Sequence, residues 1–407
     1  MRVVIDAMCA EYGGIRTYVE HLLLGWADAH PEDEVHVALR AGSTLATPGL
    51  TRHEYAVGRP DALSRPWIQA TAMHRMIKSV APDVVLATAP TTDVRRSDAA
   101  LAVVILDLRA EILPHQFSRG RRLLRKVSYE RAYSLADGFL SISQRSLDDL
   151  HRLHPDTAAK PGTVAYLGGD HARAWPTSTS TPPKGQVWRG EPSTMAGREV
   201  NDGEPRDVST ERRPAIAFAH HTNKNPQLVI DAWALLRARG VDVPPLTFLG
   251  VSGELRSGLT ESIENHGLTD EITLSKFLPD EEFQRTFADA SMVVFPSDFE
   301  GFGLPVVEAQ TLRKPLVIAP DAGLVEVAGG HAAVTTDWTP SALAEAIEQA
   351  METSDEQLDA AEKWAAEFTW RRCIEVTHAA LTDLVSARPS NRPGNRPNNR
   401  PSKGKKR

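Results

Sequence analysis

Two glutamates eight positions apart, Glu300 and Glu308, border a glycine-rich turn in the stretch SDFEGFGLPVVEA, residues 297–309. Pro305 suits the first position of a helix, so the turn before it should present free backbone N–H groups at a helix N-terminus. Glu308 then lies about one turn into that helix, where its carboxylate could accept two hydrogen bonds from ribose hydroxyls. Glu300 precedes the amides and could hold the hydroxyls of a sugar. Acidic groups near a helix start also stabilise the helix dipole, but that alternative leaves the two glycines, the aromatic residue and the proline unexplained.

A second loop of this kind, AEYGGIRTYVEHLL, follows the first expected strand. Gly13 and Gly14 would let the backbone come close to a ligand, and a helix from Ile15 would turn its N–H groups toward an anion. A tight strand-to-helix turn favours the same residues. The loop has neither the spaced third glycine nor the acidic residue after the second strand that mark a dinucleotide site.

The third loop, FAHHTNKNPQLVIDAW, follows another expected strand. Asn225 can cap a helix whose first position is Pro226. Lys224 would then point its ammonium group at an anion bound at that N-terminus. A surface lysine beside a helix cap is common, so the loop alone leaves both interpretations open.

Strands and helices must alternate along the first part of the chain to hold these loops. Short, nearly continuous apolar runs are typical of parallel strands covered on both faces. The alternation predicts a doubly wound domain over residues 1–169, whose ligands would bind beyond the carboxyl ends of the strands. Expected strands are 2–6, 34–39, 83–89, 101–107, 138–143 and 163–168, and expected helices are 15–29, 67–80, 119–135 and 144–153.

The alternation stops at residues 170–214, which are rich in Pro, Ser, Thr, Gly and charge and therefore predict a flexible linker or insertion. It restarts over 215–385, where a second doubly wound domain is expected. The tail, 386–407, repeats Asn-Arg-Pro and should be disordered. Expected strands of the second domain are 215–221, 246–250, 272–278, 292–296 and 315–320, and two long helices are expected at 340–352 and 355–385.

Length and composition fit this division. A chain of 407 residues suits two domains, and 41% hydrophobic with 24% charged residues is typical of a soluble α/β protein. Its two cysteines, Cys9 and Cys373, lie far apart in the sequence and favour a reducing compartment over a disulfide framework. Without an apolar run long enough to span a bilayer, the chain is expected to be cytoplasmic, neither exported nor membrane-spanning.

The net charge of −7 hides an asymmetry. From Ser386 to Arg407 there are eight basic residues and no acidic ones, so the rest of the chain carries 38 basic against 53 acidic residues, a net charge of −15. This negative charge makes general binding of nucleic acid by the rest of the chain improbable.

The stretch SDFEGFGLPVVEAQTLRKPLVIAPDAGLVEVAGGHAAV closely resembles the donor-site signature of family 4 retaining glycosyltransferases. Further pieces resemble the same family and follow in its order: GGIRTYVEHLL, LDLRAEILPHQFS, ADGFLSISQRSLDDL, VAYLGGDH, NKNPQLVIDAW and FLPDEEFQRTFADASMVVFPS. The resemblance implies a GT-B architecture, an α/β fold of two Rossmann-like domains that face each other across a cleft. The last helix would cross back to the first domain.

The resemblance also assigns roles to the residues of the three loops. Glu308 would bind the donor ribose and Glu300 the transferred sugar, while Lys224 would face the diphosphate. A lysine and helix dipoles would neutralise that diphosphate, so no metal or other cofactor is expected. The remaining donor-binding residues would be Gly13 and Gly14 on the opposite side of the diphosphate, and the backbone amides of Gly301, Phe302, Gly303 and Leu304.

Two departures from the family pattern concern the reacting groups. Many members have His-Asp at the end of the strand 101–107, whereas this chain has Leu106 and Asp107. Asp107 would orient the sugar or the acceptor and is, with Glu300, the candidate catalytic residue. The arginine often found early in the third loop is also missing, with Ala219 or His220 near its place.

The activity implied is transfer of a hexose, with retention, from a GDP- or UDP-linked sugar to a glycan or lipid-linked acceptor in cell-surface polysaccharide or glycolipid synthesis. Mannose from GDP-mannose is the preferred donor. One alternative is a catalytically impaired GT-B protein that serves as a nucleotide-sugar-binding or partner subunit. A GT-B epimerase or phosphorylase is a weaker alternative, because neither a pyridoxal lysine motif nor an epimerase-like carboxylate set is apparent.

The expected helix 119–135 carries a basic band, Arg121, Arg122, Arg125 and Lys126, with Leu123, Leu124 and Val127 on its other side. One interpretation is an amphipathic helix whose apolar side packs on the sheet. The other is that the band, helped by the basic tail, meets an anionic membrane or an acceptor phosphate. The second would place the protein at the inner face of the cell membrane.

Overall fold

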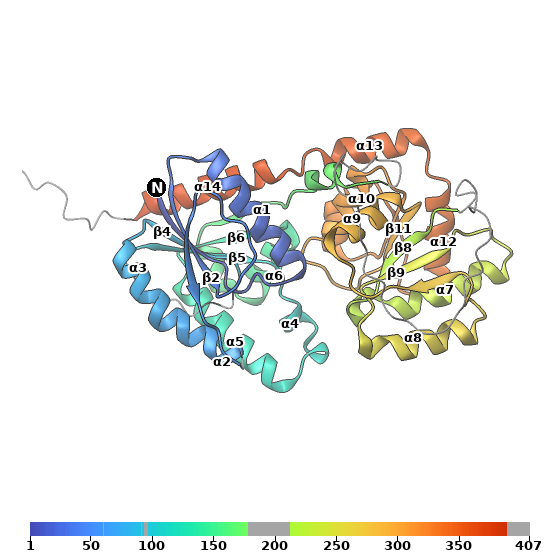
Figure 1. Ribbon diagram of the computed structural model, residues 1–407, viewed down its shortest axis with the longest axis horizontal. Coiled ribbons are helices and arrows are strands. Elements are labelled where there is room, and N and C mark those ends of the chain that lie inside the picture. The colour runs from blue at the N-terminus through green and yellow to red at the C-terminus, as the bar shows by residue number, and fades with distance from the viewer. Residues whose placement is uncertain (60, 91, 93–96, 178–211, 389–407) are drawn as a thin grey trace, which may run out of the picture.

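Two parallel β-sheets, each flanked by helices, organise the computed structural model, which describes residues 1–59, 61–90, 92, 97–177 and 212–388 (Figure 1). We call the parts built on the first and second sheets the first and second domains. Every strand pairing in both sheets is parallel. The central strands are buried along their whole length, as β-branched and apolar runs covered on both faces should be.

The first sheet has seven strands, with the first strand of the chain near its middle. In spatial order they are β3 (Thr51–Tyr55), β2 (Glu34–Arg40), β1 (Arg2–Asp6), β4 (Val84–Ala87), β5 (Ala100–Ile105), β6 (Gly138–Ser141) and β7 (Gly162–Val164). The helical segments of this part are α1 (Gly13–Ala29), α2 (Asp61–Ile68), the π-helical η1 (Gln69–Met73), α3 (His74–Val80), α4 (Arg109–Ile112), η2 (Pro114–Gln116), α5 (Arg119–Leu135), α6 (Gln144–Leu153), η3 (Pro155–Ala159) and η4 (Asp170–Ala174).

The second sheet has six strands with the same kind of order. They are β10 (Ile272–Leu274), β9 (Leu246–Leu249), β8 (Ala215–Phe218), β11 (Met292–Phe295), β12 (Leu316–Ile318) and β13 (Ala333–Val334). The helical segments are η5 (Thr222–Lys224), α7 (Pro226–Ala238), α8 (Gly253–Asn265), α9 (Asp280–Asp289), α10 (Leu304–Thr311), α11 (Ala322–Ala328), α12 (Pro340–Met351), α13 (Asp355–Ala365) and α14 (Trp370–Ala387).

The last helix, α14, leaves the second domain and packs on the first, against α1 and the strands β5, β6 and β7 (Figure 1). Glycines make room for it. A Cβ at Gly25 of α1 would lie 2.4 Å from Ile374, and one at Gly138 of β6 would lie 2.7 Å from Leu384. The first domain is therefore built from both ends of the described chain.

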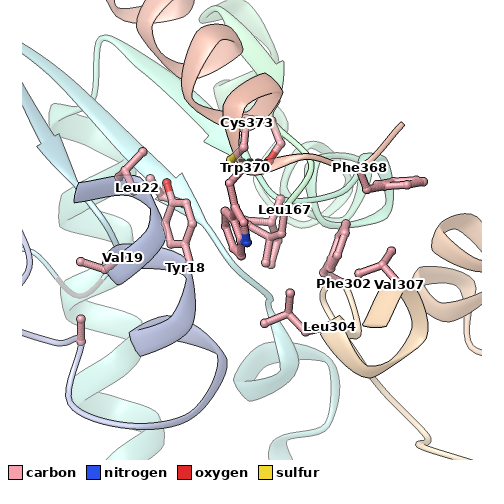
Figure 2. Packing of buried hydrophobic residues seen from close by; sticks show 14 of the residues in the cluster. Tyr18, Val19, Leu22, Leu167, Phe302, Leu304, Val307, Phe368, Trp370 and Cys373 are labelled. Atoms are coloured by element: carbon pink, nitrogen blue, oxygen red, sulfur yellow. Dashed lines mark hydrogen bonds between the residues drawn. The ribbon is translucent and has the colours of Figure 1, made fainter. Parts of the chain in front are cut away.

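One hydrophobic cluster runs through both domains where they meet. Figure 2 shows side chains of α1 and α14 on one side and of the loop before α10 on the other. Phe302 of that loop and Leu304, the first residue of α10, are 2% and 9% exposed. The Phe302 ring lies among Tyr166 and Phe368, with ring centroids 6.4 and 6.0 Å away. Burial of this apolar surface fixes the loop against the first domain.

The predicted strands are present with ends within a few residues, but several predictions need correction. The sequence analysis missed β3 and β13. The single helix expected over 355–385 is two helices, because the chain turns after Ala365 and α14 starts anew at Trp370. The side chain of Thr369, its N-cap, accepts a hydrogen bond from Arg372 N at 3.2 Å. The helix expected over 67–80 begins at Asp61 and passes through a π-helical turn.

Helix α5 has the predicted bounds but not the expected packing. Leu123, Leu124 and Val127 are 65%, 44% and 59% exposed, so the interpretation that they pack on the sheet is wrong. Tyr129 and Tyr133, further along the helix, are buried instead.

Most of the expected linker, 178–211, and most of the tail, 389–407, lie outside the described residues. Within the part that the structure describes, no helix is both long enough and apolar enough to cross a membrane.

Candidate functional site

The strand orders define where each sheet can bind a ligand. The order reverses between β1 and β4 in the first sheet and between β8 and β11 in the second. In open parallel sheets, the loops at the carboxyl ends of such a pair diverge and leave room for a ligand. Gly13 and Gly14 follow β1, Lys224 follows β8, and Glu300 follows β11. All three predicted loops thus leave strands at a switch point.

Lys224 and Glu300 are joined directly. Lys224 Nζ donates to Glu300 Oε1, and the two side chains are 8% and 17% exposed. Asn223 Nδ2 donates to the same carboxylate oxygen at 3.3 Å, and the Lys224 ammonium lies 4.3 Å from the centre of the Phe295 ring. The loops after β8 and β11 therefore form one polar unit at the switch point of the second sheet.

Helix α10 begins at Leu304, one residue before the proline that was predicted at its first position. Gly303 is its N-cap at φ 85°, a left-handed conformation that glycine adopts without strain. Asn225 departs from the prediction: it lies at the N-cap of α7, but its side chain makes no cap hydrogen bond and instead donates to Pro296 O at 2.8 Å. It ties the loop after β8 to the end of β11.

Glu308 lies on α10 and is 6% exposed. His171 Nε2 is 3.2 Å from Glu308 Oε1, and Trp370 Nε1 donates to His171 Nδ1 at 3.0 Å. Sequence reasoning missed His171 and Trp370, since neither belongs to the three loops.

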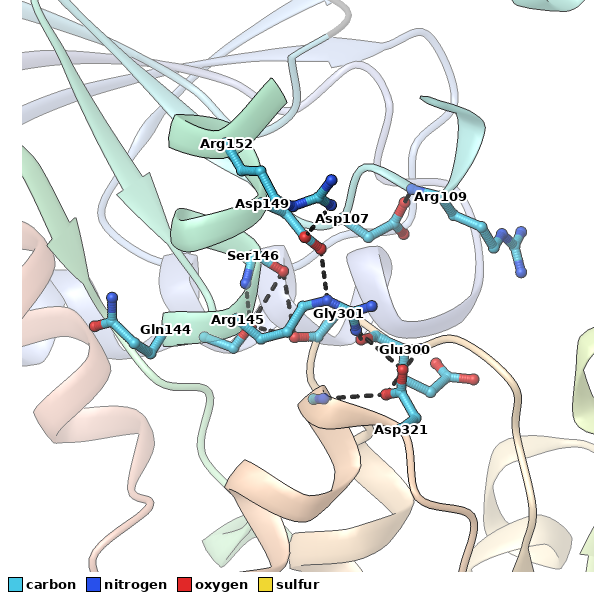
Figure 3. A network of polar contacts seen from close by, with 12 residues as sticks. Asp107, Arg109, Gln144, Arg145, Ser146, Asp149, Arg152, Glu300, Gly301 and Asp321 are labelled. Carbon is cyan, nitrogen blue, oxygen red and sulfur yellow. Dashed lines mark hydrogen bonds and ion pairs between the residues drawn. The ribbon is translucent and has the colours of Figure 1, made fainter. Parts of the chain in front are cut away.

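We call residues 296–303, between β11 and α10, the donor loop. Polar contacts hold this loop to the first domain (Figure 3). Ser143 Oγ donates to Gly301 O, and Arg145 Nη1 donates to Glu300 O at 2.9 Å and to Asp321 Oδ2 at 3.1 Å. Asp321 in turn accepts from Glu300 N at 3.3 Å and caps α11. Arg145, from α6, thus positions the backbone on which the Glu300 side chain stands. No motif singled it out.

Gly301 lies against the end of β5. A Cβ at this position would lie 2.0 Å from Leu106 O and 3.2 Å from Asp107 Cβ, so only glycine fits without movement. The backbone of Leu106 therefore touches the donor loop although the family histidine is missing. Asp107 Oδ1 accepts from Arg109 N at 2.9 Å, which makes its carboxylate part of the start of α4.

The glycines after β1 lie on the other side of the same loop. Gly13 has φ 66° and, with Gly14, forms the first turn of α1, two residues earlier than predicted. A Cβ at Gly14 would lie 3.7 Å from Leu304 Cδ1. The structure thus brings Gly14 to Leu304, and Asp107 to Gly301, while the Phe302 side chain points into the interface core.

Arg109 is a further cation that the sequence analysis missed. Figure 3 shows its guanidinium group extending on the same side as the Glu300 carboxylate. Burial lowers the pKa of His220 to about 3, and the charges of Lys224 and Arg109 act in the same direction. Burial also raises the pKa of Asp298, and the positive charge of Arg109 opposes this increase. Arg109 therefore lies near the place where the family arginine is missing. Its position after the motif aspartate was the only available signal.

Among the described residues, His30, Glu32 and His378 form a group that could hold a metal ion, with ligand atoms within 4.8 Å of one another. Their positions, at the end of α1 and in the middle of α14, lie away from the three loops. The residues of the loops themselves offer an ammonium group, amides and hydrogen-bonding carboxylates.

Comparison with solved structures identifies the fold. The Thermosynechococcus elongatus sucrose-phosphate synthase matches with a TM-score of 0.71 at 14% identity, over 95% of this chain and all of that one. The Anabaena protein HepE, solved in complex with UDP-glucose, matches with a TM-score of 0.67 at 18% identity, over 95% of this chain and all of that one. The protein has the GT-B fold of glycosyltransferases.

A family model matches the part of the chain that holds the second domain. Residues 210–367 match the family model "Glycosyl transferases group 1". The D-inositol 3-phosphate glycosyltransferase of Paenarthrobacter aurescens is 32% identical over 40% of this chain and 42% of its own length. The O-antigen chain mannosyltransferase B of Escherichia coli is 28% identical over 38% of this chain and 41% of its own length. The chain thus matches about two fifths of the length of these curated relatives.

Proposed function

We propose that the protein is a retaining glycosyltransferase of family 4 that transfers a hexose from a nucleotide sugar to a glycan or lipid-linked acceptor. The observation that carries this proposal is the pairing of Lys224 with Glu300 at the switch point of the second sheet, with Glu308 buried on the helix that follows. One cation, two carboxylates and a helix N-terminus are the groups that a diphosphate, a ribose and a sugar require.

Retention would follow from departure of the diphosphate and attack by the acceptor on the same face of the sugar. Lys224 would stabilise the leaving diphosphate, with the first turns of α1 and α10 turning N–H groups toward it. Glu300 would hold the sugar, and Asp107 would orient the sugar or the acceptor. Such positioning needs no metal ion, and we propose none.

The donor is proposed to be GDP-mannose, with a UDP-linked hexose as the other candidate. The mannosyltransferase among the relatives supports the first, and the UDP-glucose complex of HepE supports the second. The acceptor would belong to cell-surface polysaccharide or glycolipid synthesis.

The second candidate is a nucleotide-sugar-binding subunit without catalysis, favoured by Leu106 in place of a histidine. A thermal-shift screen with GDP, UDP and their sugars, followed by a donor hydrolysis assay, separates the two. A ligand at a hundredfold excess over Kd stabilises by about 2.7 kcal/mol, which is readily seen. A shift with turnover supports the transferase, a shift without turnover the subunit, and no shift with any nucleotide contradicts both.

We also propose that α5 meets an anionic membrane, with the protein at the inner face of the cell membrane. The exposed Leu123, Leu124 and Val127 support this contact. In the sequence they alternate with Arg122, Arg125 and Lys126, which form the other side of the helix, so that apolar insertion and attraction to anionic lipid act together. Arg121 and the basic tail would add charge.

A further inference from the structure

His171 lies where the chain leaves the first domain, on η4, and its ring contacts groups from three other helices. It bonds to Glu308 of α10 and to Trp370 of α14. The His21 ring of α1 lies with its centroid 4.8 Å from that of His171, and it stacks on Trp370 with centroids 4.6 Å apart and planes 12° apart. The histidine is 11% exposed, so neighbouring side chains rather than solvent fix its ring.

The partners of His171 determine where its proton lies. The indole N–H of Trp370 can only donate, so Nδ1 of His171 must be the accepting nitrogen. In a neutral imidazole the other nitrogen, Nε2, then carries the proton. That N–H donates to Glu308 Oε1, which as a carboxylate oxygen can only accept. The two hydrogen bonds, from Trp370 to His171 and from His171 to Glu308, therefore donate in the same direction.

The backbone around His171 leaves it little freedom. A Cβ at Gly168 would lie 2.3 Å from Trp370 N, and one at Gly169 would lie 2.8 Å from Val307, the neighbour of Glu308. Gly169 N also donates to Phe368 O at 3.0 Å, and Trp370 N donates to Asp170 Oδ1 at 3.0 Å. These contacts hold η4 against α10 and the start of α14.

We infer that His171 is a positioning residue for the nucleotide site: its Nε2–H holds Glu308 Oε1 and so orients the carboxylate toward the ribose hydroxyls. This inference rests on the proposed function, because it takes Glu308 as the ribose-binding group. Among the described residues, the other oxygen of Glu308 has no hydrogen-bond partner. One oxygen is thus occupied by the protein and the other is left to accept from the ribose.

The test compares a ribonucleotide with its dideoxy analogue. Isothermal titration with UDP and GDP, and with the 2′,3′-dideoxy form of each, measures how much of the affinity depends on the ribose hydroxyls. In the wild type the ribonucleotide should bind more tightly. His171→Leu should weaken ribonucleotide binding about tenfold, the size expected for a hydrogen bond to a charged group, and leave dideoxynucleotide binding unchanged. His171→Gln, which keeps an N–H donor, should recover most of the loss.

Two further variants sharpen the test. Trp370→Phe keeps an aromatic ring but removes the N–H donor that fixes the tautomer, and should give a smaller loss than His171→Leu. In a Glu308→Ala background, His171→Leu should have no further effect. His266→Leu, at an exposed histidine paired with Asp231 on α7, is the matched control and should bind like the wild type.

The outcomes separate the inference from the proposed function. If His171→Leu binds both nucleotide forms like the wild type, or weakens both equally, His171 has at most a structural role and the inference is overturned. If Glu308→Ala binds the ribonucleotide as tightly as the wild type, or if the wild type binds none of the nucleotides, the proposed nucleotide site itself fails and the inference fails with it.

Discussion

Lys224 of the loop after β8 donates to the carboxylate of Glu300 in the loop after β11, and the two charges neutralise each other in a largely buried position. A diphosphate that enters this site must compete with Glu300 for the ammonium group. The pair is therefore the arrangement of the site without ligand. A nucleotide sugar whose diphosphate bound Lys224 would free the Glu300 carboxylate to bind the sugar.

Breaking this pair from one side should cost stability. Lys224→Met leaves the Glu300 charge buried without its partner, and we expect the free energy of unfolding to fall by about 3 kcal/mol. The double variant Lys224→Met/Glu300→Gln removes both charges and should recover most of that loss. Urea unfolding measures both. A double variant that is less stable than either single one would show that the pair does not act as a unit.

The two glutamates should differ in what they do. Glu308→Ala should strongly reduce the thermal shift produced by nucleoside diphosphates, because it removes the group proposed to bind the ribose. Glu300→Ala should retain the shift and lower turnover by about a hundredfold or more. Thermal shift and donor hydrolysis on the same preparations check this. Equal loss of binding in both variants would contradict the division of roles.

Gly301→Ala should disturb the contact between the domains. Its Cβ would lie 2.0 Å from Leu106 O, so the loop must move, and we expect a loss of about 1–3 kcal/mol together with loss of turnover. Gly258→Ala is the matched control. That glycine lies inside α8 with nothing within 4 Å of an added Cβ, and alanine there should stabilise by up to about 1 kcal/mol. Differential scanning calorimetry of both variants decides the matter, and a Gly301→Ala protein as stable as the wild type would contradict the described contact.

His220 should make the protein less stable in mild acid. Burial lowers its pKa from the usual 6.5 to about 3. Between these values the unfolded chain binds a proton that the folded chain does not, so stability falls as the pH drops below about 6.5. His220→Asn should therefore lose less stability than the wild type between pH 7.5 and 5, by on the order of 1 kcal/mol after allowance for partial exposure. Melting temperatures at both pH values test this, with His266→Asn expected to follow the wild type.

The exposed apolar residues of α5 should carry membrane binding. Replacing Leu123, Leu124 and Val127 by Gln should abolish cosedimentation with vesicles of phosphatidylglycerol and phosphatidylcholine. Stability should change by no more than about 0.5 kcal/mol, since these side chains are exposed. Phe277→Gln, at a side chain that is 71% exposed on the second domain, is the control and should still bind. Unchanged binding of the triple variant would exclude α5 as the contact.

The sequence predicted best what depends on local pattern. The bounds of α5 and α6 agree with the predicted ones because helical periodicity is a local signal. The same periodicity could not show which face of α5 is packed. Tyr129 and Tyr133 anchor the helix, and the leucines at its start are left exposed.

The residues of the site could also be predicted only where the signal is local. Lys224 and Glu308 could be singled out because each stands beside a turn that leads from a strand into a helix. The contact of His171 with Glu308 could not, because the two residues are 137 positions apart and meet only when η4 packs on α10. Arg145 could not be predicted for the same reason, since its role depends on carbonyl and carboxylate oxygens of the other domain.

The chain passes between the domains twice, once near Gly169 and once near Phe368, and the hydrogen bond between these residues holds the two passages side by side. Two adjacent crossings form a hinge. We expect the second domain to rotate about the line that joins them, with little twisting or sliding. Any opening of the second domain should therefore follow one arc, which moves Glu300 and Lys224 away from Asp107 and Arg109 while His171, close to the hinge, stays near Glu308.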